Sequence, residues 1–216
     1  MYFQIYKELV EIYNMQKGIF VVIDGQDGTG KTTIVDEVAT RLKDMNYKVN
    51  ITKEPTFGPI GTLIRENDFK GYILGDLVAA DRLYHIENEI RPALEQGDIV
   101  ISDRYVASSY VCQQLDGVPV EFIQQINANV ITPDISVFIL ADEMEVSKRM
   151  SEREHLARME KMYSFRETEV LYKQAISIYN ANGFGEIIEL YNNNKNDFEN
   201  NVQKIVCLID SRMRGF

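Results

Sequence analysis

The sequence predicts a three-layer α/β/α fold built on a five-stranded parallel sheet. Short apolar, β-branched runs alternate along the chain with longer segments that carry apolar residues at helical spacing. A glycine-rich turn directly follows the first apolar run, and a segment with helical spacing follows that turn. Strands that are apolar throughout are typical of a parallel sheet that helices cover on both faces.

Five segments are expected to be strands. The first is the β-branched run at 19–23, which Gly18 introduces. Gly97 precedes the third strand, and Pro133 interrupts the chain just before the fourth. The other expected strands are 49–52, 98–102, 135–140 and 186–191.

The helix after the glycine-rich turn would bury a face formed by Ile34, Val35, Val38, Leu42 and Met45. Further helical patterns cover about 76–95, 105–115, 120–129, 144–180 and 197–211. Residues 1–17 are expected to form an N-terminal extension, either an amphipathic helix or a loose segment. No linker divides the remainder, so 18–216 is expected to be a single domain.

Composition excludes several classes of protein. The chain has 23 basic and 33 acidic residues and a net charge of −10, so nucleic acid is not an expected partner. No apolar run approaches 18 residues, so no membrane association is expected. Two cysteines are too few for a disulfide framework, and charged residues interrupt the N-terminal segment, which does not resemble a secretory signal. A cytoplasmic protein with reduced thiols is the expectation.

The strongest motif is the glycine-rich loop itself. Residues 25–32 match G-x-x-x-x-G-K-[ST], in which backbone N–H groups wrap a phosphate and the next helix adds its positive end. Lys31 is expected to reach the β- and γ-phosphates of ATP, and the Thr32 hydroxyl to face Mg²⁺. The expected ATP-binding residues are Gly25, Gln26, Asp27, Gly28, Thr29, Gly30, Lys31, Thr32 and Thr33.

Asp103 directly follows the third expected strand. A carboxylate at the tip of an apolar strand beside a phosphate loop is the usual position for a residue that orients Mg²⁺ or its waters. The same side chain also suits the cap of the next helix, and the two roles are compatible. Thr32 and Asp103 are therefore the expected metal residues.

With these motifs in place, the chain resembles the thymidylate kinase family, which transfers a phosphoryl group from ATP to dTMP. The similarity runs from about Gly18 to the C-terminus. Its motifs are the phosphate loop, Lys53-Glu54-Pro55-Thr56, Ala79-Ala80-Asp81-Arg82, Ile90-Arg91-Pro92-Ala93-Leu94, and Asp103-Arg104-Tyr105 followed by Ser108, Ser109 and Gln113. The resemblance implies a P-loop kinase with a helical lid, formation of dTDP for dTTP synthesis, and a homodimer.

The resemblance also implies roles for individual residues. Asp27 would bind the 3′-hydroxyl of the acceptor sugar, and Lys53 would contact the acceptor phosphate. Arg82 and Arg104 would hold the phosphate and base side of the acceptor, and planar arginine forks suit phosphate well. The full implied substrate-binding set is Asp27, Lys53, Arg82, Arg104, Tyr105, Ser108 and Gln113, in which Tyr105 would crowd the 2′ position and Gln113 would lie near the pyrimidine edge.

A basic segment at about 148–166 is expected to be the lid, because it holds six basic and three acidic residues in an acidic chain. The family carries a catalytic arginine either in the phosphate loop, where this chain has Gly28, or in the lid. Gly28 therefore favours a lid arginine, with Arg153 first and Arg149 or Arg158 next. The implied catalytic residues are Lys31, Arg104 and Arg153.

Three positions depart from the family pattern. Val78 stands where the family has a Phe that stacks on thymine, and stacking is worth about 1–3 kcal/mol per base. Lys53 replaces an Arg and lacks its two-point grip, and Ala157 replaces an Asp in the lid. The residues that could supply the missing ring are Phe57, Phe69 and Tyr72. Because of Val78, a kinase for another deoxynucleoside monophosphate is the first alternative.

Three other functions are alternatives to this one. A deoxynucleoside kinase would phosphorylate thymidine rather than dTMP. A GTPase is suggested by Asn194-Lys195-Asn196-Asp197, which matches N-K-x-D, but no D-x-x-G follows the third strand and Asp197 is better explained as a helix cap. A non-catalytic nucleotide-binding protein conflicts with the intact Lys31, Thr32, Asp103 and Arg104.

Overall fold

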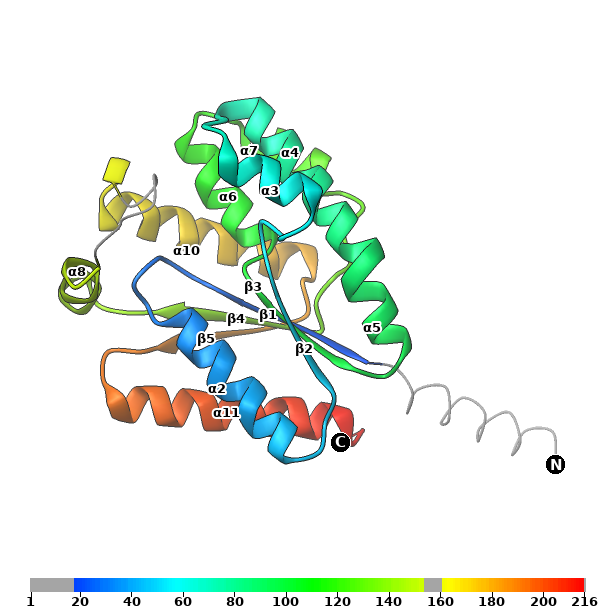
Figure 1. The fold of residues 1–216 in the computed structure, drawn as a ribbon. Coiled ribbons are helices and arrows are strands. Elements are labelled where there is room, and N and C mark those ends of the chain that lie inside the picture. The colour runs from blue at the N-terminus through cyan, green and yellow to red at the C-terminus, as the bar shows by residue number, and fades with distance from the viewer. Residues whose placement is uncertain (1–17, 154–160, 216) are drawn as a thin grey trace.

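The structure, a computed structural model, describes residues 18–153 and 161–215 of the chain. At its centre is a five-stranded, all-parallel sheet in the order β2-β3-β1-β4-β5 (Figure 1). The strands are β1 (Ile19–Asp24), β2 (Val49–Lys53), β3 (Ile99–Asp103), β4 (Ile135–Leu140) and β5 (Glu186–Tyr191). All five predicted strands and the three-layer architecture are therefore confirmed.

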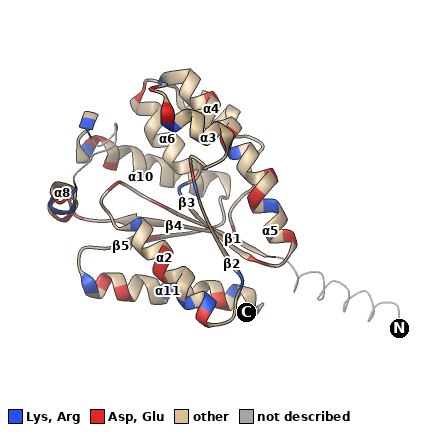
Figure 2. Ribbon diagram, viewed as in Figure 1, with Lys and Arg blue, Asp and Glu red and all other residues tan. Residues whose placement is uncertain are grey.

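Helices cover both faces of this sheet. The helical segments include α2 (Lys31–Asp44), α3 (Pro59–Glu66), α4 (Gly71–His85), the π-helical turn η1 (Ile86–Ile90), α5 (Arg91–Glu95), α6 (Val106–Leu115), α7 (Val120–Ile126), α8 (Glu143–Ser151), α10 (Phe165–Asn182) and α11 (Lys195–Met213). Helices α2 and α11 lie on one face, and α6, α10 and the α4–α5 segment lie on the other (Figure 1). Figure 2 shows that acidic and basic residues are mixed along these outer helices.

The alternation of side chains along β1 explains the two cores. Val21 and Ile23 point toward α2 and α11, whereas Phe20 and Val22 pack with α6 and α10 on the opposite face. Every residue of β1 is buried, as expected for a central strand of a parallel sheet. The two cysteines lie in α6 and α11, on opposite faces of the sheet, and both are free thiols.

The helical pattern at 144–180 was wrong as one continuous element. Helix α8 ends at Ser151, and α10 starts anew at Phe165. The Ser164 side chain accepts a hydrogen bond from the Glu167 backbone N–H while the Glu167 carboxylate accepts from that of Ser164. This S-x-x-E capping box is readable in the sequence and marks the new start.

The predicted helix at 76–95 also differs in detail. It begins earlier, at Gly71, and contains the π-helical turn η1 before α5. Pro92 explains the irregularity, because proline has no N–H to donate to the carbonyl four residues earlier and its ring crowds that carbonyl. Helix α3 was not predicted, and the helix predicted at 120–129 ends at Ile126.

The carboxyl ends of β1, β2 and β3 meet at one edge of the sheet, which is where ligands bind in open α/β folds. The phosphate loop follows β1, the segment with Glu54 follows β2, and Arg104 follows β3. The predicted N-terminal extension and the centre of the predicted lid, including Ala157 and Arg158, lie outside the described residues. None of the described helices is long and apolar enough to cross a bilayer.

Candidate active site

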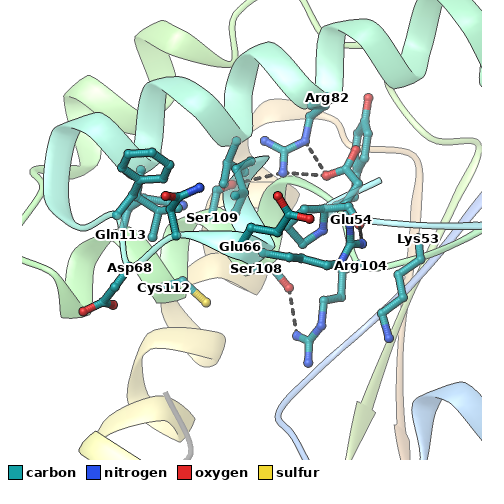
Figure 3. Close-up of a pocket in the computed structure, with 18 of the residues that line it drawn as sticks. Lys53, Glu54, Glu66, Asp68, Arg82, Arg104, Ser108, Ser109, Cys112 and Gln113 are labelled. Carbon is teal, nitrogen blue, oxygen red and sulfur yellow. Dashed lines mark hydrogen bonds and ion pairs between the residues drawn. The ribbon is translucent and has the colours of Figure 1, made fainter. Parts of the chain in front are cut away.

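A cavity of about 670 Å³ opens at this edge of the sheet (Figure 3). Asp27 and Arg104 lie where it meets the phosphate loop, and Phe69, Leu74 and Val78 form part of an apolar wall. Four basic and four acidic side chains line it: Lys53, Arg65, Arg82, Arg104, Asp27, Glu54, Glu66 and Asp68. The cavity therefore carries no large excess of positive charge, and individual positions decide where an anion binds.

The phosphate loop requires glycine where it turns. Gly25 has φ 141°, and a Cβ there would lie 2.2 Å from the carbonyl oxygen of Ile139 in β4. Gly28 and Gly30 also have positive φ, and Gly30 precedes α2, which begins at Lys31. The predicted loop-to-helix geometry is thus present, with the N-terminus of α2 at the site.

Lys31 is the buried cation of the loop. Its Nζ donates to the carbonyl oxygen of Gln26 at 2.6 Å and lies 3.9 Å from Asp27 Oδ1. Burial and, secondarily, the nearby charge of Arg104 lower the pKa of Lys31 to about 8, although acidic neighbours oppose the shift.

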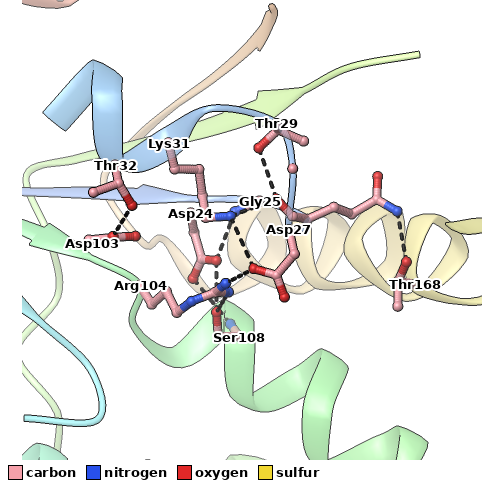
Figure 4. Close-up of polar contacts among 12 residues, drawn as sticks. Asp24, Gly25, Asp27, Thr29, Lys31, Thr32, Asp103, Arg104, Ser108 and Thr168 are labelled. Atoms are coloured by element: carbon pink, nitrogen blue, oxygen red, sulfur yellow. Dashed lines mark hydrogen bonds and ion pairs between the residues drawn. The ribbon is translucent and has the colours of Figure 1, made fainter. Parts of the chain in front are cut away.

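Thr32 and Asp103 meet as the sequence predicts. The Thr32 hydroxyl donates to Asp103 Oδ2 at 2.8 Å (Figure 4), and the Lys53 ammonium lies 3.4 Å from the same oxygen. Asp103 Oδ1 is buried without a hydrogen-bond partner among the described residues. A hydroxyl and a carboxylate oxygen beside a phosphate loop fit Mg²⁺, which binds few protein groups and shares phosphate oxygens.

Asp24 organises the site, although no role for it was predicted from the sequence. Its Oδ1 accepts from the Gly25 N–H and the Ser108 hydroxyl at 2.8 Å each, and its Oδ2 accepts from the backbone N–H groups of Tyr105 and Ser108 at 3.1 Å. The fully buried carboxylate thus joins the loop after β1 to the start of α6. A charged residue ending an otherwise apolar strand was the available signal.

Arg104 adopts a strained backbone conformation at the centre of the site. Its φ is 82°, a value that non-glycine residues rarely adopt and that costs about 1–3 kcal/mol. The side chain forms an ion pair with Asp27 and donates to the Ser108 hydroxyl at 3.2 Å (Figure 4). Burial raises the pKa of Asp27, but the charges of Arg104 and Lys31 outweigh it, so the net pKa is below the ordinary value.

Arg82 is buried at the side of the cavity, and only 1% of its surface is exposed. Its Nε and Nη2 contact Glu54 Oε2 at 2.8 and 2.7 Å, and further hydrogen bonds reach Ser109 and Asn127. A buried ion pair of this kind leaves the arginine oriented before any ligand arrives. No role was predicted from the sequence for Glu54 or Asn127.

Tyr105, Gln113 and Ser108 line the cavity as well. Tyr105 is fully buried, and its hydroxyl donates to the Ile131 carbonyl oxygen at 3.0 Å. The hydroxyl of Ser108 is engaged with Asp24 and Arg104. Gln113 is 2% exposed, and its Oε1 has no partner within the described part of the chain, as expected for an atom that awaits a ligand.

Of the three candidate aromatic rings, the structure brings only Phe69 into the cavity. Phe57 is 81% exposed and lies under the Arg65 guanidinium, and Tyr72 is half exposed and packs edge-to-face on Phe122. Phe69 and Val78 line the same cavity although they are nine positions apart in sequence.

In the described part of the lid, Arg149 and Arg153 lie in different surroundings. Arg149 on α8 holds the loop from outside: its Nη1 donates to the carbonyl oxygens of Gly28 at 3.3 Å and Thr29 at 3.0 Å, and its Nη2 to that of Asn192 at 2.8 Å. Arg153 is near enough to Asp27 for its charge to lower the pKa of that carboxyl. A Cβ on Gly28 would meet Met150 and Val146 of α8 at 3.1 Å, so α8 occupies the space beside the loop.

The N-K-x-D match has a structural role at the start of α11. Asn194 is the N-cap: its side-chain oxygen accepts from the backbone N–H groups of Asn196 and Asp197 at 2.9 and 3.0 Å. The Asp197 carboxylate accepts from the Asn193 backbone N–H and the Asn194 side chain. The expectation that Asp197 is the cap is corrected to Asn194, with Asp197 in its first turn.

Comparison with known proteins identifies the family. The sequence profile of the thymidylate kinase family matches residues 23–200, most of the chain and all of the site described above. The chain belongs to the thymidylate kinase family. It is 39% identical over 159 residues to a probable thymidylate kinase of Pyrobaculum calidifontis, an alignment that covers 71% of this chain and 80% of the relative.

Other thymidylate kinases show similar identity. The probable thymidylate kinase of Caldivirga maquilingensis is 37% identical over 153 residues, which cover 68% of this chain and 75% of the relative. The thymidylate kinase of Xanthomonas oryzae pv. oryzae is 37% identical over 126 residues, or 56% of each chain. The family predicted from the motifs is therefore confirmed.

Proposed function

We propose that this chain is an enzyme that transfers the γ-phosphoryl group of ATP to dTMP and releases dTDP. Membership of the thymidylate kinase family supports the reaction. The observation that carries the proposal is that a phosphate loop and a separate cavity meet at Asp27 and Arg104. Two nucleotides bound on either side of these residues would present donor and acceptor phosphates to each other.

The donor would bind to the phosphate loop. The loop N–H groups and the start of α2 would hold the phosphates, and Lys31 would neutralise the β- and γ-phosphates. Thr32 and Asp103 would hold Mg²⁺, which supplies charge neutralisation on the phosphate oxygens. The unpartnered Asp103 Oδ1 supports this assignment.

The acceptor would bind in the cavity with its phosphate toward Lys53 and Arg104. Arg82, Gln113 and the apolar wall would then face the base, and Asp27 would reach the sugar 3′-hydroxyl. Of these groups, the unpartnered Gln113 Oε1 gives the cavity a polar position for the edge of a base. Tyr105 and Ser108 would act mainly by positioning Arg82 and Arg104, since both are already hydrogen-bonded within the protein.

Catalysis would depend on alignment and charge. Phosphoryl transfer spreads charge over the transferred oxygens and needs little covalent chemistry from the protein. Lys31, Arg104 and a lid arginine would surround the transferred group, and Arg153 is the described lid arginine that acts electrostatically on Asp27. Closure of the lid would exclude water, which otherwise competes as an acceptor.

A panel of acceptors tests this function. The full chain, with ATP and Mg²⁺, is assayed with dTMP, dUMP, dCMP, dGMP, ribosyl-TMP and thymidine, and the nucleotide products are separated by chromatography. We expect dTMP to give the highest kcat/KM and thymidine to give no product. Lys31→Ala should lower turnover roughly 100-fold or more.

The panel also separates the alternatives. Preference for another deoxynucleoside monophosphate would keep the mechanism and change the base. Product from thymidine, or hydrolysis of GTP without any acceptor, would contradict the proposed reaction, and tight ATP binding without transfer to any acceptor would indicate a non-catalytic protein.

We also propose that the chain forms a homodimer through α4. Ile73, Ala80, Leu83 and Tyr84 recur at helical spacing on this helix and are all exposed, with Ile73 at 63%. Leu63 on the neighbouring α3 is also exposed. A contiguous set of large exposed apolar side chains is typical of a surface that another chain covers.

A further inference from the structure

His85 is completely buried at the end of α4, and none of the roles proposed above uses it. Both of its ring nitrogens have partners. Nδ1 lies 3.1 Å from Glu54 Oε1, and Nε2 shares a hydrogen bond with the Thr52 hydroxyl. Because a carboxylate only accepts, Nδ1 carries a proton and donates a hydrogen bond to Glu54, while the Thr52 hydroxyl lies between Nε2 and Glu89 Oε2.

Glu54 links this histidine to the acceptor cavity. While its Oε1 faces His85, its Oε2 accepts from Arg82 Nε at 2.8 Å and lies 2.7 Å from Nη2 (Figure 3). Glu54 is 3% exposed, so no bulk water replaces a lost partner. Thr52, His85, Glu54 and Arg82 thus form one chain of hydrogen bonds from β2 to the cavity, buried except at its Thr52 end.

This chain of hydrogen bonds is important because most of the Arg82 donors already have partners. A guanidinium has five N–H donors. Two go to Glu54, one Nη2 donor reaches Ser109 at 3.0 Å, and one Nη1 donor reaches Asn127. Among the described residues this leaves one Nη1 donor for a ligand, so the plane of the guanidinium decides where that donor points.

We propose that His85 is a positioning residue for the acceptor nucleotide, which acts through Glu54 to hold the plane of Arg82. The inference rests on the proposed function, in which Arg82 faces the acceptor. Without the Nδ1–H donor, the buried Glu54 Oε1 loses its partner, and the carboxylate rotates toward other donors and takes Arg82 with it. The effect concerns the acceptor, because the polar partners of His85, Glu54 and Arg82 among the described residues all lie outside the phosphate loop at 25–33.

Two isosteric variants separate positioning from packing. In His85→Asn the side-chain amide occupies the place of Nδ1 and can still donate to Glu54. In His85→Gln the amide occupies the place of Nε2, keeps Thr52 as a partner and leaves Glu54 Oε1 without one. Glu89→Gln is the matched control, because Glu89 is exposed and contacts the Thr52 side of the ring, with its Oε2 3.8 Å from Nε2.

The kinetic readout is KM for dTMP at saturating ATP, measured beside KM for ATP and the thermal midpoint of each variant. We expect His85→Gln to raise KM for dTMP about tenfold, the size of one lost hydrogen bond to a charged group, with KM for ATP unchanged. His85→Asn and Glu89→Gln should stay within about twofold of the wild-type chain. Equal KM values in all four proteins, an equal rise in both histidine variants, or a parallel rise in KM for ATP would overturn the proposal.

A second readout needs no substrate. The Arg82 Nε–H is buried against a carboxylate, so its ¹⁵N-resolved proton resonance should exchange slowly in the wild-type chain and in His85→Asn. In His85→Gln it should shift and exchange faster, and an unchanged resonance would overturn the proposal. If the wild-type chain does not phosphorylate dTMP, the proposed function fails, whereas this resonance still decides whether His85 positions Arg82.

Discussion

Burial lowers the pKa of Lys31, so its charge changes within the pH range in which ATP binding can be measured. Only 5% of the residue is exposed, and burial lowers its pKa to about 8 in the absence of nucleotide, with Arg104 adding to the shift. A bound triphosphate favours the protonated ammonium, so ATP binding is linked to the protonation of this group. The affinity is complete while free Lys31 is protonated, below about pH 8, and falls once the pH exceeds that value.

We therefore expect the Kd for ATP to be constant near pH 7.5 and to rise up to about tenfold per pH unit above pH 8. Calorimetric titrations between pH 7.5 and 9.5 measure this dependence. Lys31→Met should bind ATP more weakly and without the rise, because the titrating group is gone. A wild-type Kd that stays flat to pH 9.5 would show that Lys31 does not control ATP binding in this range.

Phe69 lines the cavity beside Val78, and we propose that it supplies the aromatic ring that Val78 lacks. Because stacking on a base contributes about 1–3 kcal/mol, Phe69→Ala should raise KM for dTMP by about 5- to 100-fold, with KM for ATP unchanged. Steady-state kinetics measure the effect, and Phe69→Tyr should restore most of the affinity. Phe57→Ala is the control, since that ring is outside the cavity; equal KM values for both alanine variants would exclude a stacking role.

At the scale of elements, Arg149 and Arg153, at and just beyond the end of α8, have different surroundings. Arg149 donates hydrogen bonds to Glu145 and to three carbonyl oxygens around the phosphate loop. Arg153 follows the end of the helix and acts electrostatically on Asp27. Arg149 on α8 thus supports the loop, and Arg153, just beyond the end of the helix, lies near enough to Asp27 to act on its charge.

Single-turnover measurements separate these tasks. Arg153→Ala should slow the chemical step about 100-fold or more, because an arginine on the transferred group is worth about 10³–10⁵ in rate, while KM for dTMP stays within about threefold. Arg149→Ala should instead weaken ATP binding and lower the thermal midpoint, since the loop loses its external support. An unchanged chemical step in Arg153→Ala would move the catalytic role to another lid arginine.

At the scale of the whole molecule, the exposed apolar face of α4 lies on the helix that also carries Val78, Arg82 and His85. A partner seated there would stabilise the helix that lines the acceptor cavity. We expect the chain to sediment as a dimer and Ile73→Glu to shift it to the monomer, because a charge cannot be buried there without a partner. Sedimentation velocity measures the change; a monomeric wild-type chain would rule out the dimer.

Much of this architecture could be predicted from the sequence because it depends on local patterns. Apolar β-branched runs predicted all five strands, and the glycine spacing predicted the loop that joins β1 to α2. The motifs also predicted that Thr32 would meet Asp103, since parallel strands bring their carboxyl ends to one edge. The break between α8 and α10 was not predicted, although the capping-box residues Ser164 and Glu167 indicate it in the sequence.

Only the tertiary structure decided which side chains support the site. Asp24 pairs with Ser108 of α6, and Glu54 pairs with Arg82 and His85, so these contacts join residues 28 to 84 positions apart. Whether Phe69 or Phe57 lines the cavity depends on which wall each ring reaches. The spacing of apolar residues in the sequence does not predict such contacts, because burial and hydrogen bonding between distant segments arise only when the layers pack. The amino-acid sequence alone therefore determined the sheet, the phosphate loop and the family. The packing of α4, α6 and α8 around the sheet and the loop determined which partners hold the basic side chains Arg82, Arg104 and Arg149.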